Sequence, residues 1–378
     1  MPKLACFISA HGFGHATRAC AVMAALQNLV PGVHFEIFTL APGWLFEVSL
    51  SPGFTLHTLE TDIGLAQATA LVEDIPLTLQ RLDGFLPFDG TRLAQLSEQV
   101  CQSGCTGVVC DIAPLGLAVA RRAGLPSVLI ENFTWDWIYG EYAAEAPGLQ
   151  AHIDYLQRAF ELAEYHIQTT PAHPRPPTHL VTAPVSRRPR SSRDEVRDRL
   201  GIPRSAPAVL ITTGGIPEDY GFLDRLAHCR PCHFILPGNW PARNPEDGGL
   251  PSNVTLLPHH SAFFHPDLVH ASDAVIGKAG YSTVAETYQA GIPFGYVLRA
   301  RFRESEVLQR FIEDQMLAIE IPEPTFKDGS WLERLPDLLA LPPGPRRDSN
   351  GADEAAAFIG QHLMQTPGGH NGHSGFSL

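Results

Sequence analysis

The sequence predicts an α/β protein made of two Rossmann-like, doubly wound domains that face a common cleft. Three observations predict this fold class. Segments of strand length alternate with segments of helical periodicity up to about residue 170. The alternation restarts near residue 205, after a stretch rich in proline, arginine and serine. Each half also opens with a strand that runs into a glycine turn, as parallel sheets that bind ligands often do.

The first half begins with a continuous apolar run at residues 4–8, which suits a parallel strand buried on both faces. A glycine turn follows, and apolar residues then recur at helical spacing from 16 to 29. By the same criteria we expect strands at 33–40, 106–111 and 126–130, and helices at 67–82, 92–101, 117–123 and 148–164.

The second half starts with a strand and glycine turn at residues 208–215 and a helical segment from residue 222. We expect further strands at 233–236, 254–257, 274–276, 294–298 and 317–321. The predicted domains are therefore 1–170 and 205–350, joined by a linker at 171–204. An alanine-rich helix at about 351–365 is expected to pack back on the first domain, and residues 366–378 to be a disordered tail.

Composition narrows the class of protein. Hydrophobic residues make up 44% and charged residues 18% of the 378 residues, as in ordinary globular proteins. The net charge of −13 argues against binding to nucleic acid or to an anionic membrane surface. Because no apolar run is long enough for a membrane span and the N-terminus does not resemble a signal peptide, we expect a cytoplasmic protein.

Cysteine and histidine spacing gives little support for a metal site. The seven cysteines are an odd number, which favours reduced thiols. Cys229 and Cys232 have the spacing of a redox motif, but no second pair accompanies them. Four histidines fall between residues 259 and 270 without a zinc-site pattern. We therefore expect no metal and no cofactor other than a co-substrate.

Residues 273–286 have the pattern of a ligand-binding strand, turn and helix. Gly277 and Gly280 permit close approach of a ligand to the backbone. A helix that starts near Ser282 presents free N–H groups and a positive dipole end, which favour phosphate. Glu286, in the first turn of that helix, suits ribose hydroxyls. The alternative is a capping box, Thr283 to Glu286, in which the glutamate only closes on the helix start.

The first glycine turn carries histidines. Gly12 and Gly14 permit close backbone approach, and His11 and His15 flank them. A histidine on such a turn suits a general base near pH 7, although a packing or capping role is the alternative. Asp111 ends a predicted strand, where open parallel sheets place catalytic groups, or else it caps the next helix. The turn lacks the third glycine of the dinucleotide fingerprint, which disfavours a dehydrogenase.

Three motifs carry a resemblance to a known family: HGFGHATR at 11–18, NFTWDWIY at 132–139 and GKAGYSTVAE at 277–286. They resemble the N-terminal, glycosyltransferase-like region of plant L-arabinokinases and related standalone bacterial proteins. The chain is more distantly similar to the peptidoglycan N-acetylglucosaminyltransferase. The resemblance spans nearly the whole chain and implies the GT-B fold, without the sugar-kinase domain of the plant proteins.

The resemblance also implies site residues. Glu286 matches the glutamate that holds the donor ribose in such enzymes. The turn and helix start that face the pyrophosphate there correspond to Gly280, Tyr281, Ser282 and Thr283 here. Lys278 adds a positive charge there or is solvated. The first glycine turn of the donor domain matches Thr213, Gly214 and Gly215. Leu257 matches a position that holds the base through backbone groups. Glu304 falls where relatives carry an acid–glutamine pair, and the missing glutamine leaves the sugar open.

The activity implied is a metal-independent, inverting transfer of a sugar from a UDP-sugar to a hydroxyl of a small-molecule or lipid-linked acceptor. His15, oriented by Asp111, is expected to take the acceptor proton, with His11 as the alternative base. The sequence has no Asp-x-Asp metal motif, so backbone amides and the helix dipole are expected to stabilise the leaving UDP. Two rival functions are a UDP-sugar epimerase and a non-catalytic sensor of nucleotide sugars.

Overall fold

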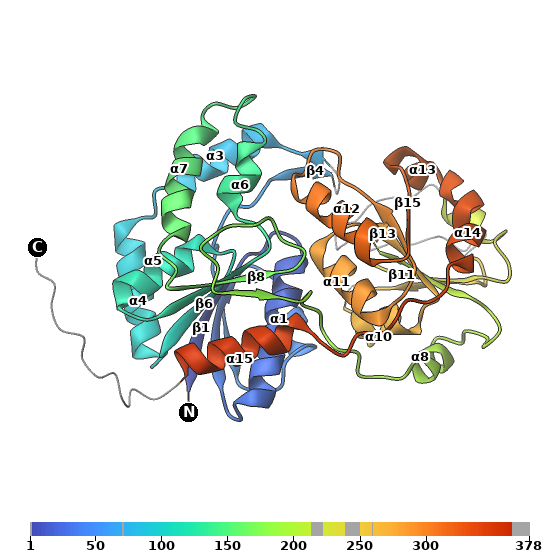
Figure 1. The fold of residues 1–378 in the computed structure, drawn as a ribbon, viewed down its shortest axis with the longest axis horizontal. Coiled ribbons are helices and arrows are strands. Elements are labelled where there is room, and N and C mark those ends of the chain that lie inside the picture. The colour runs from blue at the N-terminus through green and yellow to red at the C-terminus, as the bar shows by residue number, and fades with distance from the viewer. Residues whose placement is uncertain (1, 70–71, 213–221, 239–249, 259, 365–378) are drawn as a thin grey trace, which may run out of the picture.

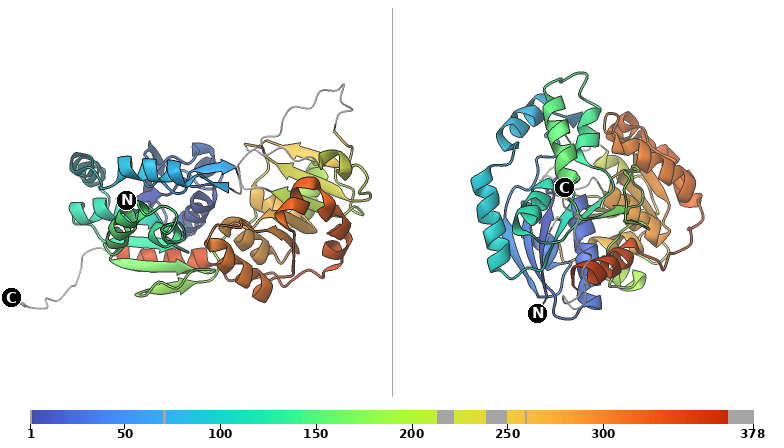
Figure 2. Two further views of the ribbon diagram at one scale, coloured as in Figure 1. Left: turned by 90° about the horizontal axis from the view of Figure 1, so that it is seen from above. Right: turned by 60° about the vertical axis from the view of Figure 1, so that its left-hand side comes forward.

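The structure is a computed structural model that describes residues 2–69, 72–212, 222–238, 250–258 and 260–364. Two lobes lie side by side, each a parallel sheet covered by helices (Figures 1 and 2). The predicted residues Thr213, Gly214 and Gly215 and the predicted tail 366–378 lie outside the described residues.

The first sheet has seven strands in the order β3-β2-β1-β6-β7-β8-β9, and all its neighbours pair in parallel. In β1, Leu4, Cys6 and Ile8 face one hydrophobic core, whereas Ala5 and Phe7 face another. This alternation shows that the sheet is covered on both faces. The strands are β1 (Lys3–Ile8), β2 (His34–Thr39), β3 (Phe54–Thr58), β6 (Gly107–Asp111), β7 (Ser127–Glu131), β8 (Tyr165–Thr169) and β9 (Leu180–Thr182).

The second sheet has six parallel strands in the order β12-β11-β10-β13-β14-β15. Val209 and Ile211 of β10 face one core, and Ala208 and Leu210 face the other. The strands are β10 (Ala208–Thr212), β11 (His233–Pro237), β12 (Val254–Leu257), β13 (Ala274–Lys278), β14 (Phe294–Val297) and β15 (Ala318–Glu320).

The helices of the first lobe are α1 (Gly14–Leu29), α2 (Gly43–Glu47), α3 (Ile75–Phe85), α4 (Gly90–Gln102), α5 (Pro114–Ala123), α6 (Trp135–Gly140) and α7 (Leu149–Phe160). Those that follow are α8 (Arg193–Arg199), α9 (Leu223–Leu226), α10 (His265–Ala271), α11 (Tyr281–Ala290), α12 (Glu304–Gln315), α13 (Glu323–Asp328), a 3-10 turn (Ser330–Arg334), α14 (Leu335–Ala340) and α15 (Gly351–Leu363). Every strand predicted above is present.

One predicted helix, at 67–82, is wrong in its first half. Residues Gln67–Thr69 (β4) and Val72–Glu73 (β5) form a small antiparallel pair, and α3 begins only at Ile75. Asp74 sets that start, because its side chain accepts a hydrogen bond from the backbone N–H of Leu77, and proline follows in the first turn. The apolar spacing across 67–82 concealed this helix start.

The segment predicted as a linker contains regular structure. Strand β9 pairs with β8 and so extends the first sheet beyond residue 170. Helix α8 is capped by Ser192, whose hydroxyl accepts from the N–H of Glu195, and its Val196 is buried in a core of the second lobe. The stretch that passes between the two lobes is therefore shorter than 171–204.

Helix α15 lies against α1 of the first lobe, although it follows the whole second lobe in the chain (Figure 1). Ala352, Ala355, Ala356, Ile359 and Leu363 share a core with the buried face of α1. The chain thus crosses between the lobes twice. Asn350 joins the two crossings, because its amide donates to the carbonyl oxygen of Ser186 and accepts from the Ser186 N–H while capping α15.

Both sheets have a topological switch point, where connections leave to opposite sides. It lies between β1 and β6 in the first sheet and between β10 and β13 in the second. The glycine turn after β1, Asp111 at the end of β6, and the turn from β13 into α11 lie at these points. Ligands of open parallel sheets bind at such crevices.

The structure corrects the role expected for Gly277. This glycine lies in β13, paired with Thr212 of β10, and a Cβ there would be 1.8 Å from the Thr212 carbonyl oxygen. It therefore permits close approach of a neighbouring strand, not of a ligand. Gly280 is different, because no atom lies within 4 Å of the place where its Cβ would be.

These two glycines give a matched test of the fold. We expect Gly277→Ala to lower the free energy of unfolding by about 1–3 kcal/mol, because the strand backbone must shift. Gly280→Ala is expected to change it by less than about 0.5 kcal/mol. Urea denaturation measures both. Equal stabilities would contradict the strand packing described here.

Candidate functional site

Two cavities lie between the lobes and meet at the start of α11. The larger, of about 360 Å³, has Phe13 and Trp44 of the first lobe on one side and Phe263 and Phe264 on the other. The smaller, of about 100 Å³, is lined by charged and aromatic residues of both lobes. Phe13, Ser282 and Thr283 line both cavities, so the helix start is their junction.

Helix α11 begins at Tyr281, one residue before the predicted start, and Gly280 is its N-cap. No side chain caps this end, and the capping box with Thr283 as N-cap is therefore wrong. Glu286 consequently lies beyond the first turn, where it cannot close on the helix start. The Tyr281 hydroxyl accepts from the N–H of Val185 and donates to the carbonyl of Thr170, which fixes the helix start to the first lobe.

His15 and Asp111 lie in contact, as the sequence predicted. An arginine that was not predicted binds the same carboxylate. His15 Nδ1 is 3.2 Å from Asp111 Oδ1. Arg18, one helical turn after His15, donates from Nε to Asp111 Oδ2 at 2.9 Å and from Nη2 to Oδ1 at 2.6 Å. Burial alone would raise the pKa of Asp111, but the Arg18 charge and hydrogen bonds lower it below its ordinary value.

His11 lines the smaller cavity, as do the residues of the turn that leads into α11. Its Nδ1 accepts a hydrogen bond from the backbone N–H of Leu65 at 3.4 Å. Gly64 has a positive φ of 63°, and a Cβ there would be 2.7 Å from His11 Nδ1, so only glycine fits this close contact. Burial, and then the charges of Arg299, His15 and Lys278, hold the pKa of His11 well below its usual value.

Glu286 lines the larger cavity, and side chains of the protein already bind both of its oxygens. Arg187 donates from Nε to Oε1 at 3.1 Å, and His265 Nδ1 is 2.9 Å from Oε2. Burial raises the pKa of Glu286, but Arg187 and His265 outweigh it and hold the pKa below its ordinary value. A ribose hydroxyl would therefore share this carboxylate with an arginine from the interlobe segment.

Glu304 links the lobes at the smaller cavity. It begins α12, and its Oε1 accepts from Asn132 Nδ2 of the first lobe at 2.7 Å. The other end of Asn132, Oδ1, accepts from Arg18. Burial raises the pKa of Glu304 despite the hydrogen bond from Asn132.

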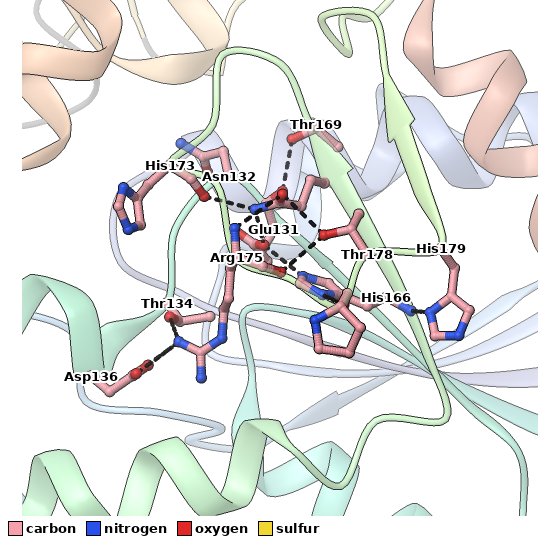
Figure 3. A network of polar contacts seen from close by, with 12 residues as sticks. Glu131, Asn132, Thr134, Asp136, His166, Thr169, His173, Arg175, Thr178 and His179 are labelled. Carbon is pink, nitrogen blue, oxygen red and sulfur yellow. Dashed lines mark hydrogen bonds and ion pairs between the residues drawn. The ribbon is translucent and has the colours of Figure 1, made fainter.

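A polar network that includes Glu131, His166 and His173 surrounds the backbone at Asn132 (Figure 3). The buried Glu131 Oε1 accepts from His166 Nε2 at 2.6 Å and from Gln168 Nε2 at 2.9 Å. The Asn132 carbonyl accepts from the N–H of His173, on the segment that follows β8. The network therefore fixes the residue that connects Arg18 with Glu304.

The other predicted residues fall into three groups. Gly12, Gly14, Lys278 and Gly280 line the smaller cavity. Leu257 is buried in the second lobe, and its carbonyl accepts from the N–H of Gly238, while the next residue, Pro258, lines the larger cavity. Thr213, Gly214 and Gly215 are outside the described residues.

Arg18, Asn132, Arg187 and His265 were not among the predicted site residues, although Arg18 and Asn132 stand in the motifs that carry the resemblance. Each acts through a partner far away in the chain, and single-sequence patterns do not reveal such pairs. A signal existed for Arg18, because it lies three residues after His15 on a predicted helix and so shares its face, and for Asn132, which opens the motif at 132–139. Among the described residues, no cluster of histidine, cysteine or acidic side chains is arranged to hold a metal ion. None of the described helices has the length and apolar character to cross a membrane.

Comparison with known proteins identifies relatives of this arrangement. No protein-family model matches the chain. The chain is homologous to L-arabinokinase of Arabidopsis thaliana, with 29% identity over 368 residues, covering 95% of this chain and 34% of the relative. The chain therefore spans about a third of the length of that curated relative.

Solved structures give the fold. A UDP-glucosyltransferase from Polygonum tinctorium superimposes with a TM-score of 0.60 at 13% identity, covering 97% of this chain and 99% of that one. The glycosyltransferase of kitacinnamycin gives 0.63 at 15%, covering 96% and 99%. MurG of Acinetobacter baumannii gives 0.54 at 14%, covering 96% and 100%. These matches confirm the predicted GT-B fold of two Rossmann-like domains.

The Arg187–Glu286 pair yields a stability prediction. Arg187→Met leaves a buried carboxylate without its cation, and we expect the free energy of unfolding to fall by about 3–5 kcal/mol at pH 7. Its neighbour Arg188 forms an exposed pair with Asp353, so Arg188→Met is expected to cost less than about 1 kcal/mol. Urea denaturation compares the two variants.

The same pair predicts a pH dependence. Because the folded pKa of Glu286 is lowered, its stabilising effect is complete above the ordinary value of about 4.3 and is lost as pH falls through the folded pKa. The difference between wild type and Arg187→Met should therefore shrink in acid. A difference that stays constant down to pH 3 would contradict the ion pair.

Proposed function

We propose that this protein is a glycosyltransferase that moves a sugar from a UDP-sugar to an acceptor hydroxyl by an inverting displacement that needs no metal ion. The observation that carries the proposal is the junction of two cavities at the start of α11. A nucleotide sugar has the same order of parts: a nucleoside, a diphosphate and a sugar.

The larger cavity suits the nucleoside. Trp44, Phe13 and Phe263 offer ring faces or edges for a base, and Glu286 with Arg187 offers acceptors and donors for ribose hydroxyls. The similar structures include a UDP-glucosyltransferase and a protein, LpCGTa, solved in complex with UDP. That likeness supports UDP as the nucleotide to test first.

The junction suits the diphosphate. Helix α11 is ten residues long, its first N–H groups have no side-chain cap, and its dipole places partial positive charge there. Lys278 and Arg299 line the adjoining cavity. As the bond from the sugar to the diphosphate breaks, these groups would stabilise the negative charge that develops on UDP.

The smaller cavity then receives the sugar. Glu304 and Gln67 offer hydrogen-bonding groups for its hydroxyls, and Phe133 and Phe302 offer apolar faces. The cavity takes residues from both lobes, so transfer requires the two lobes to be placed against each other as described here. The acceptor hydroxyl attacks the anomeric carbon as the bond from that carbon to the UDP oxygen breaks, and the acceptor proton passes to a phosphate oxygen of the departing UDP or to water.

Thermal stabilisation by a panel of UDP-, dTDP-, GDP- and ADP-sugars tests the proposal. At about 100 times its dissociation constant, a bound UDP-sugar should add about 2.7 kcal/mol to the free energy of unfolding. We expect Gly14→Val to abolish this gain, because Gly14 lines the smaller cavity beside the junction, where its Cβ would lie 3.9 Å from Ser282 Oγ.

Gly90→Val is the matched control. Gly90 is likewise the first residue of its helix and has open space around its Cβ position, but it lies outside both cavities. It should keep the full stabilisation. If no nucleotide sugar stabilises the wild type, the proposed function is withdrawn. Conversion of a stabilising UDP-sugar to its epimer without acceptor would assign the site to an epimerase instead.

A further inference from the structure

A third cavity, which we call the rear cavity, adjoins the larger one where the chain crosses between the lobes. Its volume is about 260 Å³, and it is lined by α1, the loop after α2, residues 186–190 of the first crossing and the start of α15. Arg187, Arg190 and Phe264 line both this cavity and the larger one, so they form the wall between the two. Since a water molecule takes about 30 Å³ in the liquid, the rear cavity has room for a small ligand.

Three arginines of the first crossing, Arg187, Arg188 and Arg190, line the rear cavity. Carboxylates balance two of these charges, because Glu286 pairs with Arg187 at 3.0 Å and Asp353 pairs with Arg188 at 2.5 Å. Asp353 is the one acidic residue among the described residues that line the rear cavity. The three cations therefore exceed the acids that balance them by one.

The excess cation is Arg190. Its Nη1 and Nη2 donate to the backbone carbonyl oxygens of Val48 and Ser49 at 2.6 and 2.8 Å, and its guanidinium lies over the Phe264 ring, 4.4 Å from the centroid. Asp267 accepts from the backbone N–H of Arg190, and among the described residues no carboxylate forms an ion pair with its guanidinium. These contacts hold the charge in place without neutralising it, so the cavity keeps a positive charge.

A buried hydroxyl lines the same cavity. Ser49 is 4% exposed, and its Oγ has no hydrogen-bond partner of good geometry within the described part of the chain. The polar group beside it is the thiol of Cys20, which is a weak donor and acceptor. Buried hydroxyls in native proteins are nearly always hydrogen-bonded, so this one indicates a ligand or an ordered water in the cavity. Because Arg190 binds the carbonyl oxygen of the same residue, the hydroxyl and the excess charge lie close together.

We propose that the rear cavity binds the phosphate group of a small anion through Ser49 and Arg190. Arg188, whose side chain is 57% exposed, lies at the mouth of the cavity and adds a second guanidinium. A guanidinium presents several N–H donors in a planar fork that matches the oxygens of phosphate. The site lies across the wall from the nucleoside cavity and does not rest on the proposed function.

Calorimetry of the full chain with inorganic phosphate tests the site. Arg190→Gln removes the excess charge and should weaken phosphate binding about tenfold to a hundredfold, whereas Ser49→Ala removes a neutral donor and should weaken it about threefold to tenfold. Arg188→Gln alters an exposed residue, so the fold should be kept and binding weakened about threefold. Unchanged phosphate affinity in Ser49→Ala and Arg188→Gln overturns the proposal.

Two control variants match these changes outside the rear cavity. Arg204→Gln alters an exposed arginine that pairs with Asp194. Ser305→Ala removes another buried hydroxyl that has no partner among the described residues. Both should bind phosphate within about twofold of wild type. A loss in the controls as large as in the cavity variants overturns the proposal.

The helix start of α11 is the other place where phosphate can bind, and Gly14→Val, which fills space beside it, separates the two sites. Phosphate binding that is kept in Gly14→Val and weakened in Arg190→Gln places the anion in the rear cavity. The reverse pattern overturns the inference and leaves the proposed function standing. A wild type that binds no phosphate at millimolar concentration overturns the inference whatever the result with UDP-sugars.

Sugar 1-phosphates and acetate complete the panel of probes. Tighter binding of a sugar phosphate than of inorganic phosphate supports a phosphorylated metabolite as the ligand, and the opposite order supports the free ion. Acetate that binds as tightly as phosphate overturns the assignment to phosphate, because a site with two guanidinium groups and a hydroxyl should prefer the anion with more oxygens and more charge.

Discussion

The ion pair of Arg18 and Asp111 is the interaction on which the rest of the site depends. It joins α1 to the end of β6, and the same guanidinium reaches Asn132 after β7 and Thr169 of β8. One buried cation thus holds four neighbouring elements at the carboxyl edge of the first sheet. Asn132 carries the connection on to Glu304 of the second lobe, so the same interaction helps to position one lobe against the other.

Much of the fold could be predicted because buried parallel strands are continuous apolar runs, as in residues 4–8. The prediction failed where the apolar spacing was ambiguous, as at Gln67–Thr69, where a hairpin precedes the true helix start. The meeting of His15 with Asp111 followed from topology, since both lie at the switch point of one sheet. The contact of Glu286 with Arg187 could not be predicted in this way, because Arg187 lies on a segment 99 residues away in the chain.

The charge distribution bears on how a chain with a net charge of −13 could hold the anionic ligand proposed above. Three of its site cations are each paired with a buried carboxylate: Arg18 with Asp111, Arg187 with Glu286 and Arg299 with Glu73. Attraction for a phosphate group would then depend on short-range donors and a helix dipole, and not on a long-range field. Binding of this kind is expected to be less sensitive to salt than binding to an exposed basic patch.

The position of α15 has a consequence for the way the chain folds as it is made. The first lobe lacks one of its covering helices until residues 351–363 have been synthesised, since these residues complete the core around α1. The ribosome must therefore release the entire second lobe before the first can close. Domains usually fold in the order of their synthesis. Here the lobe that starts first is completed only after residues 351–363 have been made, and until then the face of α1 that they cover is exposed to water.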